Sequence, residues 1–326
     1  MGDNRRMPDP SGALRVGVVG CGAFGRNHAR VYGELQAHSG HKLHFAGVAD
    51  SDFTRAQAIA REYGTEAYGS VDELIAAGVN AVSVAVPTVS HREVAGRLMQ
   101  SGVDVLIEKP LAVTIAEADE LIALARRHDR IAQVGHLERF NPAILAAEPM
   151  LSRPRFIECH RLAPFRERGT DVNVVLDLMI HDIDLVQMIV GSPVASLDAV
   201  GTPVFSSEID IANARLRFEN GCVANVTASR VSLKTERKLR VFRDDAYLSL
   251  DLQQKILTVI RKRAVSGAGE LPVQIEEQSF AQGDALLAEI RAFLSAIRGE
   301  GPVVVSGEDG ERALRTAIQI SEVTHA

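Results

Sequence analysis

The chain has 326 residues, a formal net charge of −6, a hydrophobic fraction of 46% and a charged fraction of 24%. These values are typical of a soluble globular protein and exclude a largely disordered chain. Because one hydrophobic core rarely serves more than about 300 residues, we expect two domains. The basic residues are scattered along the chain, which argues against nucleic acid as a partner.

Three features bear on the compartment. The cysteines Cys21, Cys159 and Cys222 have neither the number nor the spacing of a disulfide framework or a zinc site, which fits a reducing cytoplasm. No stretch approaches the ~18 apolar residues of a membrane span. Residues 1–12 carry charge and proline without a following apolar region, and we predict a flexible tail. We therefore predict a cytoplasmic protein without membrane insertion.

From Leu14 to about residue 135, apolar runs alternate with helical patterns. The apolar runs are LRVGVVG, KLHFAGVAD, AVSVAVP and VDVLIEKP. Near-continuous apolar strands that alternate with helices favour a parallel sheet covered on both faces. We predict a doubly wound α/β domain over residues 13–137.

The first strand is followed by a glycine-rich loop. Gly20, Gly22 and Gly25 have the spacing G-x-G-x-x-G between an apolar strand and a helix. Such glycines allow a tight turn, the close approach of a pyrophosphate, and close packing of helix on strand. The N–H groups at the helix start, near Ala23 and Phe24, then hold the phosphates. This loop predicts a dinucleotide site.

An aspartate ends the second apolar run. Asp50 lies near the position at which the acid of the dinucleotide fingerprint accepts hydrogen bonds from the adenosine ribose. A 2′-phosphate would be repelled by this carboxylate, so NAD is favoured over NADP, although Arg55 could moderate the preference. A glycine-rich turn with a surface aspartate is the alternative.

After about residue 138 the pattern changes. A helix is indicated near 174–190, and long alternating runs follow that fold back at ENG and RDDA. Such runs predict antiparallel hairpins with one buried face and one available face. We expect a second, α+β domain over 138–305, which binds the substrate and forms oligomers, and an amphipathic helix over 306–326.

Two short motifs carry titratable groups. Lys109 follows an apolar strand in LIEKP, and Asp177, His181 and Asp184 are spaced in DLMIHDID so that they share one face of a helix. A histidine flanked by carboxylates suits a base that takes a proton near neutral pH. Alternatively, Lys109 caps a strand and His181 is a satisfied core histidine. A metal site lacks a fourth ligand, and we predict none.

The glycine fingerprint, AVPTVSH at 85–91, EKP at 108–110 and DLMIHDID at 177–184 occur together and in order, and the chain resembles the Gfo/Idh/MocA oxidoreductase family from Leu14 to Val323. The resemblance implies a Rossmann domain, then a domain with an open, mostly antiparallel sheet, and a final helix that returns to the first domain. The open sheet face is typically the oligomer interface, so a homodimer or homotetramer is expected. NAD is the implied cofactor, with Pro87, His91, Glu108 and Lys109 beside it.

A closer likeness links QVGHLERFNP and HRLAPFRERGTDVNVVLDLMIHDID to family members that oxidise C3 of UDP-N-acetylglucosamine. The family resemblance implies that His181 takes the hydroxyl proton, Lys109 orients the hydroxyl, and Asp177 tunes both. The implied substrate residues are Arg139 and Asn141, with an ordinary helix start at Pro142 as the alternative, and Arg161, Arg166 and Arg168, with solvated surface arginines as the alternative. An inositol or simple-sugar dehydrogenase and a non-catalytic NAD- and sugar-binding sensor remain alternative functions. A tightly held NAD that 2-oxoglutarate reoxidises is also compatible with the sequence.

Overall fold

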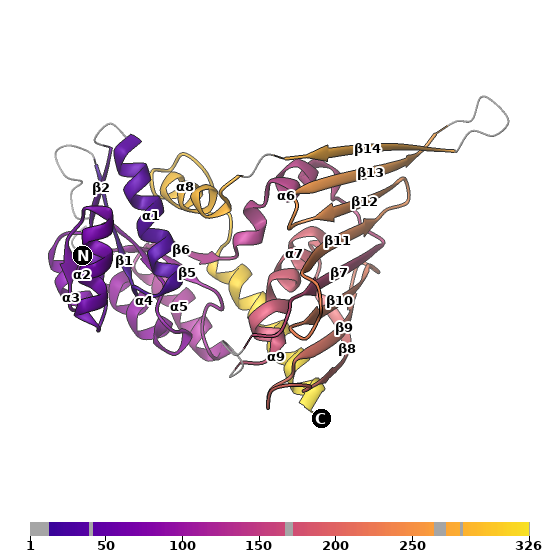
Figure 1. The fold of residues 1–326 in the computed structure, drawn as a ribbon, viewed down its shortest axis with the longest axis horizontal. Coiled ribbons are helices and arrows are strands. Elements are labelled where there is room, and N and C mark those ends of the chain that lie inside the picture. The colour runs from indigo at the N-terminus through magenta and orange to yellow at the C-terminus, as the bar shows by residue number, and fades with distance from the viewer. Residues whose placement is uncertain (1–12, 39–41, 167–171, 264–271, 281–282, 326) are drawn as a thin grey trace. The chain divides into compact units, whose positions relative to one another are not determined.

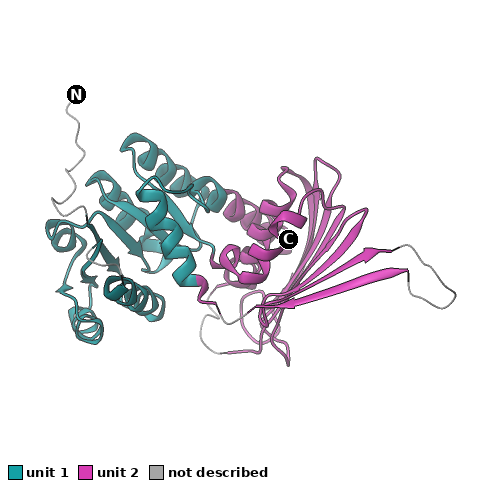
Figure 2. Cartoon of the chain, turned by 90° about the horizontal axis from the view of Figure 1, so that it is seen from above, with its two compact units in different colours: residues 1–136, 286–311 teal, residues 137–285, 312–326 magenta. Residues whose placement is uncertain are grey.

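The computed structural model describes residues 13–38, 42–166, 172–263, 272–280 and 283–325. The chain forms two compact units (Figure 2). Unit 1 consists of the chain up to His136 together with 286–311, and unit 2 consists of 137–285 together with 312–326. The tail predicted for residues 1–12 lies outside the described residues. No helix in the described ranges is both long and apolar enough to cross a membrane.

Unit 1 contains a six-stranded parallel sheet in the order β3-β2-β1-β4-β5-β6 (Figure 1). Its strands are β1 Leu14–Val19, β2 Leu43–Ala49, β3 Ala67–Tyr68, β4 Ala81–Val84, β5 Asp104–Glu108 and β6 Ala132–Gly135. Its helical elements are α1 Ala23–His38, α2 Phe53–Tyr63, α3 Val71–Ala76, η1 Thr88–Ser90, α4 His91–Gln100, α5 Ile115–Arg127 and α8 Ala285–Ile297. This strand order is that of the doubly wound dinucleotide fold.

Local signals in the sequence place these elements. Strands β1, β4 and β5 are almost wholly buried, as their apolar runs predict. Helix α2 begins after Asp52, whose carboxylate accepts a hydrogen bond from the Arg55 backbone N–H, and α5 begins with a capping box between Thr114 and Glu117. Because the strands are parallel, their carboxyl ends lie at one edge of the sheet, where the glycine loop, Asp50 and EKP all follow strands.

Helix α8 belongs to unit 1, although it comes after unit 2 in sequence. Ile290, Phe293 and Leu294 are buried in one cluster with Tyr32 of α1 and Leu106 of β5. The domain predicted from the sequence over 138–305 would have included this helix. The helix α9, Gly307–His325, is divided at Glu311, and its residues from Arg312 onward group with unit 2 rather than with the Rossmann sheet.

Unit 2 contains an eight-stranded sheet in the order β14-β13-β12-β11-β7-β10-β9-β8 (Figure 1). Neighbouring strands are antiparallel except β7 and β10, which are parallel. The strands are β7 Phe156–Leu162, β8 Val194–Thr202, β9 Ile211–Phe218, β10 Val223–Ser229, β11 Glu236–Phe242, β12 Ala246–Asp251, β13 Ile256–Lys262 and β14 Val273–Ser279. The helical elements are η2 Leu137–Phe140, α6 Pro142–Ala147, η3 Glu148–Met150, the π-helical turn η4 Val175–Met179 and α7 Ile180–Val190. The predicted fold class is confirmed: a Rossmann sheet precedes an open, mostly antiparallel sheet.

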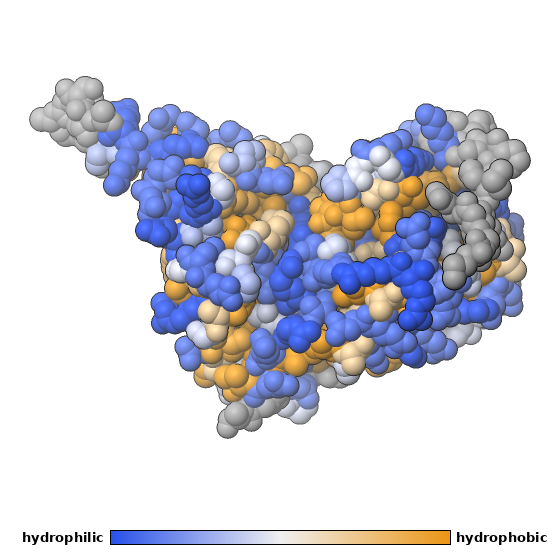
Figure 3. All heavy atoms as spheres, turned by 180° about the vertical axis from the view of Figure 1, so that it is seen from behind, coloured by the Kyte–Doolittle hydropathy of each residue, from blue (hydrophilic) through white to orange (hydrophobic). Residues whose placement is uncertain are grey.

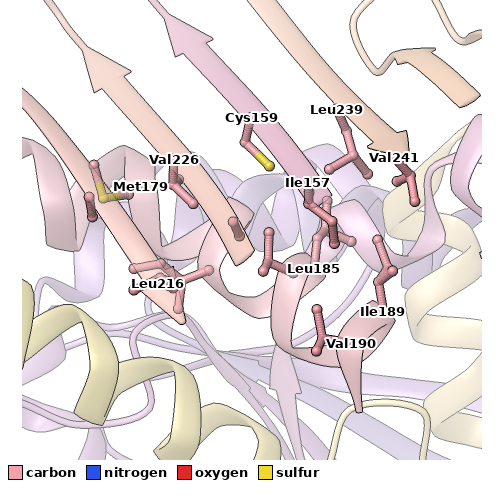
Figure 4. Close-up of a cluster of buried hydrophobic side chains, with 14 of the residues drawn as sticks. Ile157, Cys159, Met179, Leu185, Ile189, Val190, Leu216, Val226, Leu239 and Val241 are labelled. Carbon is pink, nitrogen blue, oxygen red and sulfur yellow. The ribbon is translucent and has the colours of Figure 1, made fainter. Parts of the chain in front are cut away.

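The core of unit 2 lies on one face of this sheet. Alternate residues of the central strands, including Ile157, Cys159, Leu239 and Val241, pack against Leu185 and its neighbours on α7 (Figure 4). The side chains between them point to the opposite face and remain partly exposed. A period of two along each strand therefore separates a covered face from an open one.

The open face carries an aromatic group at one end. Phe242 stacks on Tyr247 with ring centroids 4.7 Å apart, and Phe156 packs at 5.6 Å from Phe242. On the side of the molecule opposite Figure 1, hydrophilic side chains cover most of the surface, with hydrophobic patches between them (Figure 3).

Candidate active site and cofactor site

The glycine loop of unit 1 has the close contacts that a dinucleotide site requires. Gly20 has a φ of +95°, and a Cβ there would lie 2.5 Å from the carbonyl oxygen of Ala85. A Cβ on Gly25 would lie 1.6 Å from the carbonyl oxygen of Gly20. A Cβ on Gly22, in contrast, would meet nothing within 4 Å, so space is open beside it. The loop therefore fits a pyrophosphate group at Gly22 and the start of α1.

The side chain of Asp50 joins the glycine loop to the end of β2. Its carboxylate accepts hydrogen bonds from the backbone N–H of Cys21 at 2.6 Å and of Asp52 at 2.8 Å. Arg55 lies 3.7 Å from the same carboxylate and also contacts Asp52. Burial is the main cause that raises the pKa of the Cys21 thiol to about 12, and the negative charge of Asp50 adds to the shift. The thiol is therefore protonated at neutral pH. The buried Cys21 is thus part of the loop's packing rather than a reactive thiol.

His91 connects the loops that follow β4 and β5. Its ring nitrogens lie 3.0 Å from the carbonyl oxygens of Pro110 and Val86, and the side chain is buried. Burial lowers the pKa of His91, although both carbonyls oppose this shift. His91 is predicted from the sequence to lie beside the cofactor, and in the structure its ring contacts backbone carbonyls of unit 1. Pro87 immediately precedes η1 in the first of these loops.

Lys109 follows the carboxyl end of β5 and is half-buried. The neighbouring Glu108 carboxylate accepts a hydrogen bond from the Lys109 backbone N–H at 3.3 Å and lies 2.9 Å from Nε2 of His28. Burial raises the pKa of Glu108, but His28 and Lys109 outweigh it and hold the pKa below its ordinary value. His28, on α1, was not among the predicted site residues. The only signal for it is a histidine on the buried face of the helix after the glycine loop.

In unit 2, Asp177 and His181 lie on consecutive helical elements. Asp177 is in the π-helical turn η4, and His181 is in the first turn of α7; both are half-buried. Such π-helical turns are frequent at functional sites because they alter which side chains face one another. Asp184, predicted to flank His181, instead forms a bidentate ion pair with Arg139 at 2.6 and 2.8 Å.

Arg161, predicted to bind the substrate, is paired with carboxylates of its own unit. Its guanidinium donates two hydrogen bonds to Asp182, at 2.8 and 2.9 Å, and one to Glu138 at 2.9 Å. The Arg161 side chain is 4% exposed. Burial raises the pKa of Glu138, but Arg161 and Arg237 outweigh it and hold the pKa below its ordinary value. Arg161 therefore compensates buried carboxylates inside unit 2.

Asn141 has a local structural role as well. Its Oδ1 accepts the backbone N–H of Ala143 at the start of α6, and its Nδ2 donates to the carbonyl oxygen of Leu252 at 2.8 Å. The predicted substrate residues Arg139, Asn141 and Arg161 are thus all engaged within unit 2. Arg166 is exposed, and Arg168 lies outside the described residues.

Comparisons with known proteins place both units. The model of the Gfo/Idh/MocA oxidoreductase family with an NAD-binding Rossmann fold matches residues 14–136, and that of the Gfo/Idh/MocA C-terminal domain matches 147–249. The UDP-N-acetylglucosamine 3-dehydrogenase of Acidithiobacillus ferrooxidans is 38% identical over 96% of this chain and 98% of its own. The myo-inositol dehydrogenase Hyg17 of Streptomyces leeuwenhoekii is 30% identical over 67% of this chain and 70% of its own. A solved structure of UDP-N-acetylglucosamine 3-dehydrogenase GnnA from A. ferrooxidans superimposes with a TM-score of 0.88 at 38% identity, covering 95% of this chain and 97% of that one.

Proposed function

The chain belongs to the Gfo/Idh/MocA family of NAD-dependent oxidoreductases, and from this premise we propose that it oxidises the C3 hydroxyl of UDP-N-acetylglucosamine to a ketone. The observation that carries this substrate is the 38% identity to a UDP-N-acetylglucosamine 3-dehydrogenase over nearly the whole of both chains. A cyclitol substrate is the second candidate, because the inositol dehydrogenase of S. leeuwenhoekii is 30% identical over two thirds of the chain.

The residues that would hold NAD are those of the glycine loop and the loops after β4 and β5. The open space at Gly22 and the start of α1 supports pyrophosphate binding there, and Asp50 would accept hydrogen bonds from the ribose. When bound, NAD supplies the acceptor for the hydride. The family assignment also supports Pro87 and Lys109 as neighbours of the cofactor.

The chemistry needs a hydride acceptor and a proton acceptor. Oxidation breaks the C3–H bond with transfer of a hydride, breaks the O–H bond with loss of a proton, and forms the C=O bond. We assign the proton to His181, and we assign to Lys109 the orientation of the hydroxyl and the stabilisation of negative charge on its oxygen. We assign to Asp177 the role that the resemblance implies, the tuning of His181 and Lys109. The half-burial of all three side chains supports these roles, because each is held by the fold yet not sealed from substrate.

The diphosphate of the substrate needs cationic or hydrogen-bonding groups. Arg166 supports this role because it is exposed, whereas the guanidinium groups of Arg139 and Arg161 are occupied by buried carboxylates. A guanidinium fork suits a phosphate. Replacement of Arg166 by Ala should raise KM for the UDP-sugar and leave KM for a simple cyclitol unchanged.

We also propose that the open face of the eight-stranded sheet forms a homodimer or homotetramer interface. The partly exposed aromatic group of Phe156, Phe242 and Tyr247 supports this role, since aromatic side chains are enriched in interfaces. The three described cysteines are free and buried, which is consistent with the cytoplasm, where we place the enzyme.

The proposal is tested by NADH absorbance after mixing the protein and NAD with UDP-N-acetylglucosamine, myo-inositol or free sugars. Each mixture is assayed with and without 2-oxoglutarate, because a retained cofactor turns over only when it is reoxidised. We expect signal with the UDP-sugar and a rate lower by about 10²- to 10⁴-fold in Lys109→Ala, with NAD binding retained by calorimetry. Lys42→Ala is the matched control, since Lys42 is exposed before β2, at the opposite edge of the same sheet.

Two outcomes would contradict the proposal. Full turnover in Lys109→Ala would remove the assigned role of the lysine. NAD binding without NADH from any of these compounds would favour a non-catalytic sensor, and signal confined to myo-inositol would favour the cyclitol dehydrogenase.

A further inference from the structure

Unit 1 contains a group of polar side chains buried beneath α1 and α8. Polar groups in a dry interior are costly unless they are paired, so a cluster of them calls for a physical reason. The members come from five elements and are His28 and Tyr32 of α1, Ser83 of β4, Glu108 of β5, Gln133 of β6 and Glu289 of α8. All are buried except Glu108, whose side chain is 15% exposed. Glu108 is therefore the member of this cluster that reaches the edge of the site.

The carboxylate of Glu108 is held on three sides. Oε1 lies 2.9 Å from Nε2 of His28, and Oε2 accepts the Lys109 backbone N–H at 3.3 Å. On the third side is Gly135 of β6, where an added Cβ would lie 3.2 Å from both Cδ and Oε2 of Glu108. His28 itself is 1% exposed and comes from the helix that follows the glycine loop. The Glu108 carboxylate therefore links His28 of α1 to the backbone N–H of Lys109.

A second carboxyl, that of Glu289, lies in the same layer, and its pKa shifts in the opposite direction to that of Glu108. Burial and the nearby Glu108 raise the pKa of Glu289 well above its ordinary value, and its Oε1 has no hydrogen-bond partner among the described residues. Gln133 contacts α8 through its Nε2, which donates to the backbone carbonyl of Glu289. Because the pKa of Glu108 is lowered and that of Glu289 is raised, the negative charge is favoured on Glu108. The partner of His28 is therefore Glu108, the carboxyl of the two whose pKa is lowered.

We propose that His28 is a positioning residue for Lys109 and acts through the carboxylate of Glu108. The inference rests on the proposed function only in assigning Lys109 to the substrate hydroxyl. Without the ring of His28, Oε1 of Glu108 is left buried without that partner, and the carboxylate gains by turning toward the ammonium of the next residue. Lys109 is then drawn away from the hydroxyl it orients.

The test compares two replacements at one position. His28→Leu fills the volume without a donor, whereas His28→Gln places an amide N–H near the position of Nε2. We expect His28→Leu to lower kcat by roughly 10- to 100-fold with KM for NAD unchanged, and His28→Gln to restore most of the rate. His38→Leu, at the exposed end of the same helix, is the control and should retain full activity.

A double variant separates positioning from general damage. In a Lys109→Ala background, His28→Leu should cause no further loss of kcat, because its effect passes through the missing lysine. Equal losses in both backgrounds would overturn the proposal. So would a failure of His28→Gln to restore activity when its melting temperature matches that of the unchanged protein.

A second readout needs no substrate. Lysine labelling by a small amine-reactive reagent, followed by peptide mass spectrometry, should slow at Lys109 in His28→Leu and stay the same at Lys42, because an ammonium paired with Glu108 deprotonates less readily. If no sugar yields NADH but Lys109 labelling slows in this way, the proposed function fails and the positioning role stands. Equal labelling rates at Lys109 in both proteins would refute the positioning role.

Discussion

The raised pKa of the buried Glu289 carboxyl should make the stability of the protein depend on pH. The pKa of Glu289 is raised in the folded protein by burial and by Glu108. Above its ordinary pKa of 4.5, the folded state therefore holds a proton that the unfolded state releases. The contribution of this group to stability is complete below pH 4.5 and is lost as the pH rises toward the folded pKa. Glu289→Gln removes this titration and leaves the shape almost unchanged.

The magnitude follows from the proton alone. Keeping the carboxyl protonated costs about 1.4 kcal/mol for each pH unit between its ordinary pKa and its folded pKa. Glutamine avoids this cost but brings one additional N–H donor into a buried site, which costs about 1 kcal/mol if it stays unpaired. We expect Glu289→Gln to be less stable than the unchanged protein at pH 4.5 and more stable once the pH lies more than about one unit above the ordinary pKa of the carboxyl.

The assay is urea unfolding of both proteins at intervals from pH 4.5 to pH 8, with the exposed Glu300→Gln as the control. The difference in the free energy of unfolding should change sign between about pH 5 and 6 and then increase with pH. A difference that does not depend on pH would show that Glu289 is ionised in the folded protein. The assignment of the buried charge to Glu108 would then be wrong.

Two further predictions concern the glycine loop and the buried ion pairs. Gly25→Ala should abolish the stabilisation by NAD, about 2.7 kcal/mol at a concentration of 100 Kd, because its Cβ would overlap the carbonyl oxygen of Gly20; thermal unfolding with and without NAD measures this. Arg161→Leu should lower the free energy of unfolding by about 3 to 5 kcal/mol in urea, because it leaves Asp182 buried without its countercharge. Loss of the exposed Arg155 should have little effect, and a similarly small effect at Arg161 would contradict the reasoning.

The Rossmann sheet and its glycine loop could be predicted because their signals are local. Strands β1, β4 and β5 follow near-continuous apolar runs, and the G-x-G-x-x-G spacing lies within one strand–loop–helix unit. Of the close contacts, that of Gly25 with Gly20 is local, whereas that of Gly20 is with Ala85 in the loop after β4. The place of α8 could not be predicted in this way. Its apolar residues Ile290 and Phe293 show that it is buried against something, but the periodicity does not say which sheet it covers.

The roles of the arginines required the structure because a sequence gives the residue type and not its partner. Near a catalytic motif, Arg139 and Arg161 have the chemistry expected of diphosphate ligands. The carboxylates of Asp182 and Asp184 are equally suitable partners for these arginines. Only the folded structure shows that the arginines pair with the carboxylates and are not left for a diphosphate. The decision is physical: a buried carboxylate is very costly without a countercharge, whereas a solvated diphosphate is not.

These ion pairs also bear on α7, the helix that carries His181. Asp177 and Asp184 of DLMIHDID were expected to flank His181, but Asp184 forms an ion pair with an arginine, as Asp182 does, and both pairs attach α7 to other elements. Asp182 is paired with Arg161 of β7, and Asp184 is paired with Arg139 of η2. His181 lies at the start of the helix held by these pairs, and the π-helical turn precedes it. A proton acceptor must keep its position while a hydride leaves the adjacent carbon, and rigid attachment of its helix provides this. In the proposed mechanism, the two ion pairs therefore hold the helix that carries His181, the assigned proton acceptor.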